Sequence, residues 1–566
     1  MTHKTIENRS LSTAPAPARL QPPPIVWSVA GSDSGGGAGL QADLRAFDAF
    51  GVHGCTAIAA ITAQNSVAVQ CIEPVSAVML EAQLAALATD MPPAALKTGM
   101  LGSAANLQVL VRWIDRLRQD NPSLPVVVDP VLRATTGASL VDQTLLEAYR
   151  SALLPRATLI TPNRAEAAAL LGCAALDCQA AVQRAAEALL ALGCKVVVIT
   201  GGDEKGIDSE DYAATPHASG WLSLARVDTP HHHGTGCVFA SGAAAALAKG
   251  FVEIEAIILA KMATTHALRH AYAAGQGAGP VRPRAGFARH GENLPYFSIP
   301  GQAKVPGFAA LADPDLGLYA VVDSAAWVQR VLDAGIRTVQ LRIKKAPAPV
   351  TSPRAGTAGS QQLGMHPAGE FLAPGGDPSV TDAALREEVR ASIRCARAVN
   401  AQLFINDHWQ MAIEEGCYGV HLGQEDLATA DLAAIAQAGL RLGLSTHAYW
   451  EVCRAWALKP SYIACGPIHP TQAKAMPWMA QGNDNLAYWC SLLCESGRLP
   501  VVGIAGMDSE RAAQAAQCGA ASVAVISAIT AAVNPEAAIA QLQRAFAAGG
   551  ELPRWQIPEL PRPTLR

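Results

Sequence analysis

Features that mark secreted, membrane-spanning or nucleic-acid-binding proteins are scarce in this sequence. Its 13 cysteines form no Cys-x-x-Cys pair and are too sparse for a disulfide scaffold, which predicts a reducing compartment, the cytoplasm. Apolar runs stay below the roughly 18 residues that a membrane helix requires, and the first 24 residues have no apolar segment typical of a secretory signal. A net charge of −4 supplies no positive field for nucleic acid or an anionic membrane. Small molecules are therefore the expected partners.

Charged residues are also few, which favours buried, close-packed elements over a disordered chain. They make up 16% of the 566 positions, against 50% for hydrophobic residues. A domain size of about 150 residues predicts three or four domains, and two α/β domains of about 250 residues fit the length equally well. The composition leaves the oligomeric state open, a homo-oligomer included.

Short apolar runs alternate with alanine- and leucine-rich stretches in the first half of the chain. This pattern covers residues 25–282 and follows a polar, proline-rich segment at 1–24 that we expect to be a flexible tail. The strand candidates lie at 25–31, 55–65, 94–100, 125–132, 158–163 and 195–202. Near-continuous apolar strands separated by helices predict a parallel sheet covered by helices on both faces.

A second alternating series begins at Gly317, after a Gly/Pro/Arg stretch at 283–316 that we expect to be a linker. Its strand candidates lie at 317–323, 338–344, 402–407, 419–426, 441–447, 462–470, 500–507 and 522–529. Eight strand signals with helical spacers predict a (β/α)₈ TIM barrel over residues 317–548. We expect a surface insertion at 346–378, after the second strand, and a second proline-rich tail at 549–566.

Two glycine-containing segments are candidate phosphate sites. Gly37, Gly39 and Ala42 satisfy a variant of the dinucleotide-binding pattern, but the next strand ends at Gln64 without the acidic residue that would bind a ribose. We therefore reject that interpretation. The segment HHHGTGC, residues 231–237, instead opens a helix, and backbone N–H groups at a helix N-terminus favour a phosphate.

Cys237 lies in the first turn of that helix, where the same field favours a thiolate. Such a group could accept a proton from a substrate hydroxyl while the loop amides hold the phosphoryl group. The competing interpretation is a helix cap followed by a small buried cysteine, and the spacing alone supports both about equally.

Six motifs follow one another within residues 25–282, namely AGSDSGGGAGLQADL, GCTAIAAITAQN, LKTGM, VVDPV, TPNRAEAAAL and HGTGC. In this order they resemble the hydroxymethylpyrimidine/phosphomethylpyrimidine kinases, whose ribokinase-like domain has three layers, α/β/α. The resemblance implies ATP as the phosphoryl donor and Cys237 as the catalytic base. It further implies substrate contacts at Asp43, Gln64 and Met100, and a phosphate and ATP region at Asp129, Asn163, Glu166, Gly234, Thr235 and Gly236.

Several of these residues have a purely structural alternative. Asp43 would place a charge in the first turn of a helix, and Met100 would belong to the core. Asn163 and Glu166 match the spacing of a helix capping box. The repeat His231–His233 is interpreted as loop, because consecutive residues do not easily converge on one metal ion.

The strand TVQLRIK at 338–344 carries Gln340, Arg342 and Lys344 on one side. Polar and cationic residues facing into a barrel are costly unless an anionic ligand is bound there. Asp407 and Asp426 follow at the ends of two later strands, and barrel active sites lie at that face. Two such carboxylates suit Mg²⁺ that also takes phosphate oxygens as ligands.

The motifs QLRIK, FINDHW, GVHLGQEDL, LGLSTH, GPIHPTQAK and VISAI occur in order within residues 317–530. This segment is similar to thiamine phosphate synthase. The similarity implies pyrimidine diphosphate contacts at Gln340, Arg342, Lys344, Asn406, Ser445 and Lys474. It implies thiazole phosphate contacts at Thr471, Gln472, Ala473, Gly506, Ile526 and Ser527, with Mg²⁺ ligands at Asp407 and Asp426. Ala473 departs from the pattern, because relatives often have a threonine there.

Together the two resemblances predict a bifunctional enzyme of thiamine biosynthesis. Its first domain would phosphorylate an aminopyrimidine alcohol and its monophosphate with ATP. Its second would join the diphosphate to thiazole phosphate with Mg²⁺. The alternatives are a kinase for a pyridoxine-like hydroxymethyl heterocycle, and a ligand-binding protein whose catalytic sites have decayed.

Overall fold

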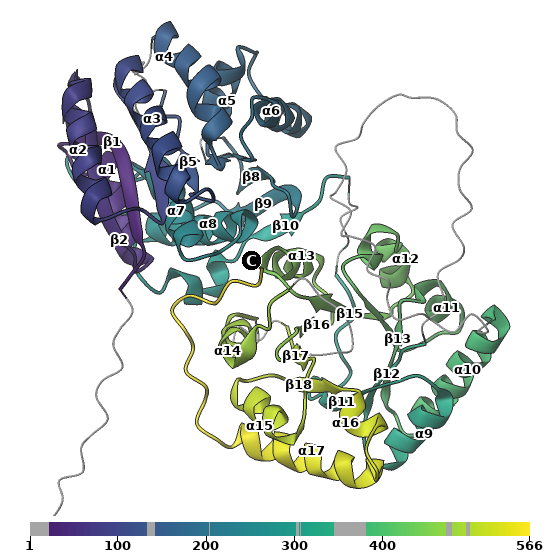
Figure 1. Cartoon of the computed structure of the whole chain (residues 1–566). Helices are drawn as coiled ribbons and strands as arrows, with labels where there is room; N and C mark the ends of the chain where they lie inside the picture. The colour runs from purple at the N-terminus through teal and green to yellow at the C-terminus, as the bar shows by residue number, and fades with distance from the viewer. Residues whose placement is uncertain are drawn as a thin grey trace, which may run out of the picture.

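Two β-sheets, one open and one closed, organise the chain in this computed structural model (Figure 1). The structure describes residues 22–132, 142–202, 204–301, 305, 307–343, 381–470, 478–493 and 499–565. The open sheet has the strand order β10-β9-β8-β7-β6-β5-β4-β1-β2-β3. Its strands are β1 (Ile25–Asp33), β2 (His53–Gln64), β3 (Val69–Pro74), β4 (Ala95–Thr98), β5 (Val126–Val128), β6 (Leu159–Ile160), β7 (Val196–Ile199), β8 (Asp208–Ala214), β9 (Ser219–Ala225) and β10 (Tyr296–Ser298).

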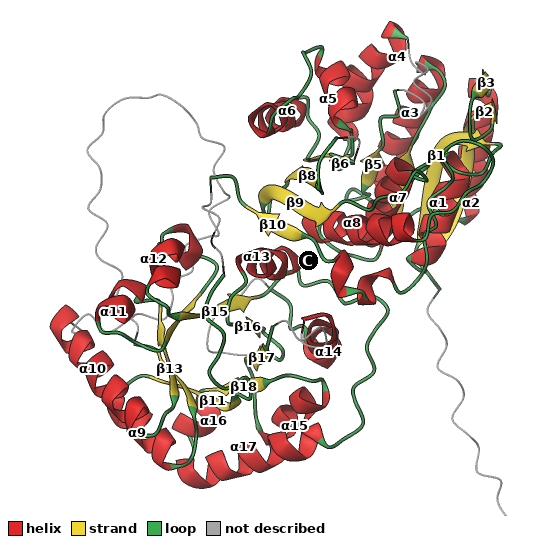
Figure 2. Ribbon diagram, turned by 180° about the vertical axis from the view of Figure 1, so that it is seen from behind, coloured by secondary structure: helices red, strands yellow, loops and turns green. Residues whose placement is uncertain are grey.

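The strands from β2 through β1, β4, β5 and β6 to β7 pair in parallel, and antiparallel strands extend both edges. Neighbouring residues of β1 point to opposite faces, so Val26 and Trp27 enter two different hydrophobic cores. Helices cover both faces (Figure 2). They are α1 (Gly39–Ala49), α2 (Ala77–Asp90), α3 (Ala104–Asp120), α4 (Gln143–Ala148), α5 (Arg164–Leu171), α6 (Gln179–Ala191), α7 (Thr235–Ala248) and α8 (Glu253–Arg269). The predicted three-layer fold is confirmed.

The closed sheet is the predicted eight-stranded parallel barrel, in which β18 pairs with β11. Its strands are β11 (Gly317–Val322), β12 (Thr338–Leu341), β13 (Gln402–Asn406), β14 (Gly419–Leu422), β15 (Arg441–Thr446), β16 (Tyr462–Cys465), β17 (Val501–Ile504) and β18 (Ser522–Val525). The surrounding helices are α9 (Ala325–Asp333), α10 (Asp382–Ala398), α11 (Trp409–Glu414), α12 (Leu432–Gln437), α13 (Tyr449–Leu458), α14 (Gly482–Leu493), α15 (Ser509–Gln517), α16 (Ser527–Thr530) and α17 (Pro535–Gly550). The predicted insertion at 346–378 lies outside the described residues.

The expected linker at 283–316 is partly wrong, because three of its residues belong to the open sheet. Residues 296–298 form β10, which pairs antiparallel with β9 and completes that edge. Three residues in a glycine- and proline-rich stretch carry no strand periodicity of their own. They become a strand because β9 presents unpaired backbone groups to them.

The two domains pack against each other through α13 of the barrel, which contacts β10 and α8 (Figure 1). Aromatic rings fill this contact. Tyr449 meets Phe251 edge-on at 6.0 Å between ring centroids, and Trp456 stacks on Tyr296 at the same distance. The centre of the domain interface is therefore apolar. One continuous hydrophobic core contains buried residues from both domains and from this contact.

The C-terminal segment 551–565 also connects the domains. The backbone N–H of Arg562 donates to Asn485 of α14 at 2.6 Å. The buried Thr564 donates through its hydroxyl and its amide to Glu255 of α8. Burial raises the pKa of Glu255 to about 7, although these hydrogen bonds oppose the shift. The second predicted tail is thus a packed strap between the domains.

In the described part of the chain, no helix is long and apolar enough to span a membrane.

Candidate active sites

The loop before α7 approaches the loop after β1 closely enough to require glycine. Gly234 has φ +84°, and a Cβ added to it would lie 2.1 Å from the carbonyl oxygen of Gly37. Gly234 is also the N-cap of α7, so it offers no capping side chain to the amides of Thr235 and Gly236. The predicted phosphate segment therefore lies at a helix N-terminus, with the first glycine-rich segment beside it.

Asp33, His233 and Gln64 form a polar cluster at this junction. The Asp33 carboxylate accepts hydrogen bonds from the amides of Gly35, Gly37 and Ala38, at 2.8–2.9 Å. His233 Nε2 lies 3.1 Å from Asp33 Oδ2 and 3.3 Å from Gln64 Nε2. Burial would raise the pKa of Asp33, but the bonds from His233 and the amides outweigh it and lower the pKa.

Asp33 was not predicted from the sequence, and His233 was expected to lie in a loop. The structure gives both residues a defined place, because the HGTGC segment packs against the loop that follows β1. The consecutive histidines contain no signal that singles out the third. The acidic residue in GSDSGGG was visible, but its carboxylate binds its own loop amides, a contact that depends on the turn conformation.

Asp43 belongs to a buried ion pair rather than to a surface that a substrate can reach. Lys97 Nζ lies 2.9 Å from both Asp43 carboxylate oxygens, and Ser28 and Ser241 donate to the same carboxylate at 2.6 and 2.7 Å. Asp43 and Lys97 are both 0% exposed. In this structure the Asp43 carboxylate is buried among these partners. The expected hydrogen bond from Asp43 to the aminopyrimidine stays a prediction.

Lys97 is the positive charge of this site, and sequence analysis did not identify it. Its ammonium group also lies 3.8 Å from Oδ2 of Asp129, an oxygen that accepts no hydrogen bond from the residues that the structure describes. Burial raises the pKa of Asp129 to about 6; Lys97 opposes this shift and Asp43 adds to it. The spacing between Asp43 and Lys97 in the chain is 54 residues, so their pairing depends on the sheet that places β4 beside β1.

The thiolate expected at Cys237 is contradicted. Burial raises the pKa of this thiol to about 12, and the carboxylates of Asp43 and Asp129 add to the effect. Lys97 acts in the opposite direction but does not overcome the burial. The helix N-terminus therefore does not ionise Cys237 in this structure, and the thiol is neutral at pH 7.

Of the remaining kinase candidates, Asn163 and Glu166 have a structural role, and Met100 lies near the site. Asn163 and Glu166 form the capping box of α5: Glu166 N donates to Asn163 Oδ1 at 2.8 Å, and Asn163 N donates to Glu166 Oε2 at 3.0 Å. The structural alternative is thus confirmed, and a metal–phosphate role stays a prediction. The side chain of Met100 packs against Gly31 near the end of β1, the strand that leads into the cluster described above.

In the barrel, Asp407 and Asp426 meet at the carboxyl ends of β13 and β14. Their carboxyl groups lie within hydrogen-bonding reach, and burial together with the charge of Asp407 raises the pKa of Asp426 to about 6. Asp407 has the left-handed φ of 64°, which is uncommon outside glycine. Two carboxylates held together repel each other unless a cation or a shared proton lies between them. This arrangement fits a divalent cation.

Arg342 lies half-buried beyond the end of β12, near Asp407. Burial lowers the pKa of its guanidinium, and Asp407 opposes that shift. Gln340 and Asn406 are buried inside the barrel. His421 of β14, a residue that sequence analysis did not assign, bonds through Nε2 to the Ser445 hydroxyl at 2.9 Å. Burial, Arg342 and His447 lower the pKa of His421 to about 3, so its ring is neutral.

The thiazole phosphate candidates are only partly described. Gly506 has φ +70°, and Ser527 begins the short helix α16 directly after the exposed Ile526. Both segments follow the last two barrel strands, where such barrels bind phosphate. The other predicted contacts fall outside the described residues: Lys344, Thr471, Gln472, Ala473 and Lys474.

Comparison with known proteins assigns both domains. The model of the phosphomethylpyrimidine kinase family matches residues 33–282, and the model of the thiamine monophosphate synthase family matches residues 318–529. A protein of Oryza sativa subsp. japonica, described as a probable chloroplastic thiamine biosynthetic bifunctional enzyme, is 32% identical over 92% of this chain and 88% of its own length. The chain belongs to the family of bifunctional thiamine biosynthetic enzymes.

Further relatives match one domain each. The thiamine-phosphate synthase of Serratia proteamaculans is 46% identical over 40% of this chain and 90% of its own length. The pyridoxal kinase of Bacillus subtilis, solved with ADP, is 35% identical over 46% of this chain and 96% of that chain, with a TM-score of 0.42. The kinase and synthase assignments are confirmed, and neither alternative is favoured. The cytoplasmic location stays a prediction, because the rice relative is described as chloroplastic.

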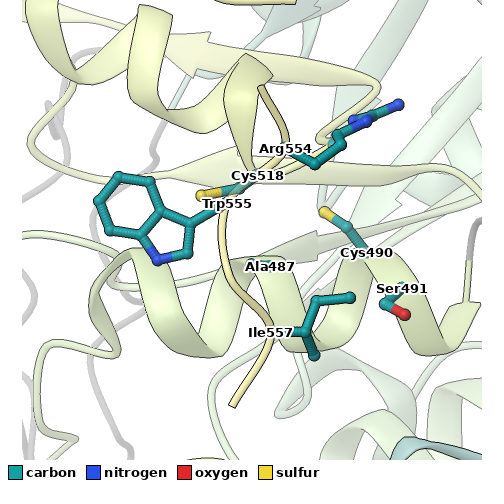
Figure 3. A pocket seen from close by; sticks show the side chains of 8 residues that line it. Ala487, Cys490, Ser491, Cys518, Arg554, Trp555 and Ile557 are labelled. Atoms are coloured by element: carbon teal, nitrogen blue, oxygen red, sulfur yellow. The ribbon is translucent and has the colours of Figure 1, made fainter. Parts of the chain in front are cut away.

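One cavity of this bifunctional enzyme lies away from both sites. It has a volume of about 190 Å³ and lies beneath the C-terminal strap (Figure 3). Arg554, Trp555 and Ile557 of the strap line it together with Cys490 of α14 and Cys518. Cys490 and Cys518 lie toward the C-terminal ends of α14 and α15. Because barrel helices run opposite to the strands, the cavity lies far from the strand ends that carry the active site.

Proposed function

We propose that the first domain transfers phosphate from ATP to 4-amino-5-hydroxymethyl-2-methylpyrimidine and then to its monophosphate. The second domain then joins the resulting diphosphate to thiazole phosphate, which gives thiamine phosphate and diphosphate. The observation that carries this proposal is the match of both family models, in this order, within one chain. The product of the first domain is the substrate of the second.

In the kinase domain, the amides of Gly234, Thr235 and Gly236 hold the transferred phosphoryl group. Lys97 acts electrostatically on Cys237 in the first turn of α7, and its own charge is paired with Asp43 and lies near Asp129. Phosphoryl transfer depends mainly on positioning and charge stabilisation, so a preorganised cation and helix N-terminus suit it.

Gln64 and Met100 are proposed to contact the pyrimidine, Gln64 through its amide and Met100 through its apolar side chain. Cys237 is proposed to accept the proton of the substrate hydroxyl. Its raised pKa sets a condition for this role, because the thiol must first lose its own proton. Lys97 already lowers the pKa of Cys237, and additional positive charge beside it would lower this pKa further.

In the synthase domain, Asp407 and Asp426 are proposed to hold Mg²⁺ near Arg342. When bound there, Mg²⁺ supplies charge that stabilises a departing diphosphate. The nearby, half-buried Arg342 adds a positive charge on the same side of the barrel. Gln340, Asn406 and Ser445 present polar groups to the pyrimidine, while the closed barrel limits access of water to a cationic intermediate.

One assay tests both halves of the proposal. The full chain is supplied with ATP, Mg²⁺, the pyrimidine alcohol and thiazole phosphate, and thiamine phosphate is measured. Product formation is expected. Parallel reactions that begin from pyrimidine diphosphate isolate the synthase, and ATP consumption with the alcohol alone isolates the kinase. Failure of either partial reaction would overturn the function proposed for that domain.

A further inference from the structure

One guanidinium group holds the backbone of the turn between β7 and β8 in the kinase domain. Arg226, directly after β9, donates through Nε to the carbonyl oxygen of Gly206 at 3.0 Å and through Nη1 to that of Gly202 at 2.6 Å. Its Nη2 donates to the carbonyl oxygens of Gly201 at 3.4 Å and Asp208 at 3.2 Å. Guanidinium nitrogens can only donate, so the direction of every bond is fixed. Arg226 thereby binds four carbonyl groups of one turn.

A buried ion pair holds the same turn through its first amide. The N–H of Gly201 donates to Asp211 Oδ1 of β8 at 3.0 Å, and Lys261 of α8 donates to Asp211 Oδ2 at 2.7 Å. Asp211 and Lys261 are 4% and 3% exposed, so water competes little for these bonds. The turn is therefore fixed by side chains from separate parts of the domain. A turn ordered in this way loses little conformational entropy when a ligand binds to it.

The turn lies at the carboxyl edge of the parallel sheet, the edge at which open α/β sheets bind their ligands. Four strand spacings separate β7 from β1, and at about 4.8 Å each they span about 19 Å, roughly the length of an extended nucleoside triphosphate. The phosphate segment at Gly234 lies beside the loop that follows β1. In the other direction, the edge leads to Gln64 of β2, the proposed pyrimidine contact. A nucleotide whose reacting phosphate lies at Gly234 therefore extends toward β7.

Gly202 leaves the backbone of this turn open to a ligand. It is exposed, and within the described residues no atom lies within 4 Å of a Cβ added there. Its φ lies outside the left-handed region, so the conformation does not require glycine. We propose that Arg226 is a positioning residue of the kinase, which holds the turn so that the backbone at Gly202 contacts the nucleoside end of ATP. This inference rests on the proposed kinase function and assigns the part of the site that holds the nucleoside.

The proposal predicts a loss of affinity that depends on the nucleoside. Contacts to the nucleoside form when the nucleotide binds, so their loss weakens ATP and ADP alike. Arg226→Ala is expected to raise KM for ATP, and the inhibition constant of ADP, about tenfold. Inorganic triphosphate lacks the nucleoside, so it should inhibit the variant and the wild type equally. KM for the pyrimidine alcohol should also stay unchanged, because its contacts lie at the other end of the edge.

Gly202→Val tests the contact without altering Arg226. An added Cβ meets no described atom, so the turn should keep its fold, while the larger side chain occupies the space proposed for the nucleoside. KM for ATP should again rise about tenfold, with the urea unfolding midpoint of the kinase domain unchanged. A Gly202→Val chain with the wild-type KM for ATP would overturn the proposed contact.

The variants are measured in the full chain, where an unchanged synthase rate shows that the barrel is intact. Should Arg226→Ala fold poorly, Arg226→Lys keeps the charge but loses the planar fork of donors, and it must show the same selective loss of nucleotide affinity. Arg226→Ala that weakens ADP and inorganic triphosphate equally, or weakens neither, would overturn the inference.

Arg150→Ala is the matched control. Arg150 also donates to backbone carbonyl oxygens, those of Leu170 and Ala169, but these lie at the C-terminal end of α5, away from the carboxyl edge of the sheet. Its loss should leave KM for ATP unchanged. A wild-type chain that consumes no ATP with the pyrimidine alcohol would reject the proposed kinase function. An active wild type whose nucleotide affinity does not depend on Arg226 would reject only the role of Arg226.

Discussion

Replacing Asp43 by asparagine tests whether this residue supports the kinase fold or binds the pyrimidine. Asp43→Asn keeps the shape of the side chain but removes its charge. In the structure, the carboxylate accepts from Lys97 at 2.9 Å, from Ser28 at 2.6 Å and from Ser241 at 2.7 Å, and neither charged partner is exposed. After the substitution, the Lys97 ammonium group has one of these two carboxylates left beside it, that of Asp129 at 3.8 Å.

The expected cost follows from that uncompensated charge. Removing one partner of a buried ion pair typically costs about 3–5 kcal/mol, most of it from the charge left behind. Ser28→Ala is the control, because it removes one neutral donor from the same carboxylate and leaves the ion pair intact. It should cost about 1.5–3 kcal/mol, since the lost hydrogen bond is to a charged group. The asparagine variant should therefore be the less stable of the two.

The assay is urea unfolding of the full chain, followed by loss of kinase activity. Synthase activity in the same samples reports on the other domain and should change little at low urea. Below the unfolding transition, KM for the pyrimidine alcohol should stay near that of the wild type in the Asp43→Asn chain. An unchanged unfolding midpoint together with a strongly raised KM would refute the buried-pair argument and restore a direct contact between Asp43 and the substrate.

Three further outcomes are expected. Cys237→Ala should lower kcat of phosphoryl transfer by about 10²–10⁴ and leave the synthase unaffected; an undiminished rate would remove Cys237 as proton acceptor. Asp426→Ala should abolish the Mg²⁺ dependence of the synthase in a metal titration, and a retained dependence would contradict the carboxylate pair. At Glu255, burial raises the folded-state pKa from 4.5 to about 7, so the folded chain retains a proton that the unfolded chain has lost. The free energy of unfolding should therefore fall as pH rises from about 5 to 7. Glu255→Gln should flatten that slope in urea unfolding measured at several pH values; an unaltered slope would mean that another group titrates.

The architecture was predictable where strands are long, apolar and bounded by glycine or proline. The runs at 25–31 and 195–202 correspond to β1 and β7, and the eight signals after Gly317 became the barrel. β10 was missed because its three residues have no periodicity and pair only with an edge formed by distant residues. The strap at 551–565 was missed for a similar reason, since proline-rich composition does not indicate which surface will bury Thr564.

In the candidate sites too, features that depend on residues close in the chain were predictable, and features that depend on distant residues were not. The helix N-terminus at Gly234 was predictable, because glycines before an alanine-rich helix determine it locally. The partner of Asp43 was not, because Lys97 is 54 residues away in β4 and meets Asp43 of helix α1 only in the folded domain. The pKa of Cys237 was predicted with the wrong sign, since the local helix field was considered without the burial that the neighbouring elements impose.

By itself, the order of the residues determined two α/β domains, the loops that end their strands, and the chemistry to which each loop is suited. Those properties depend on periodicity, on turn residues and on neighbours close in the chain. The folded chain decided which polar groups face a substrate and which neutralise one another, as Asp43 and Lys97 do. It also decided that a glycine in one strand lets Tyr462 of the next reach His421. Such pairings depend on strand register and exclusion of water, and both exist only once distant segments have packed together.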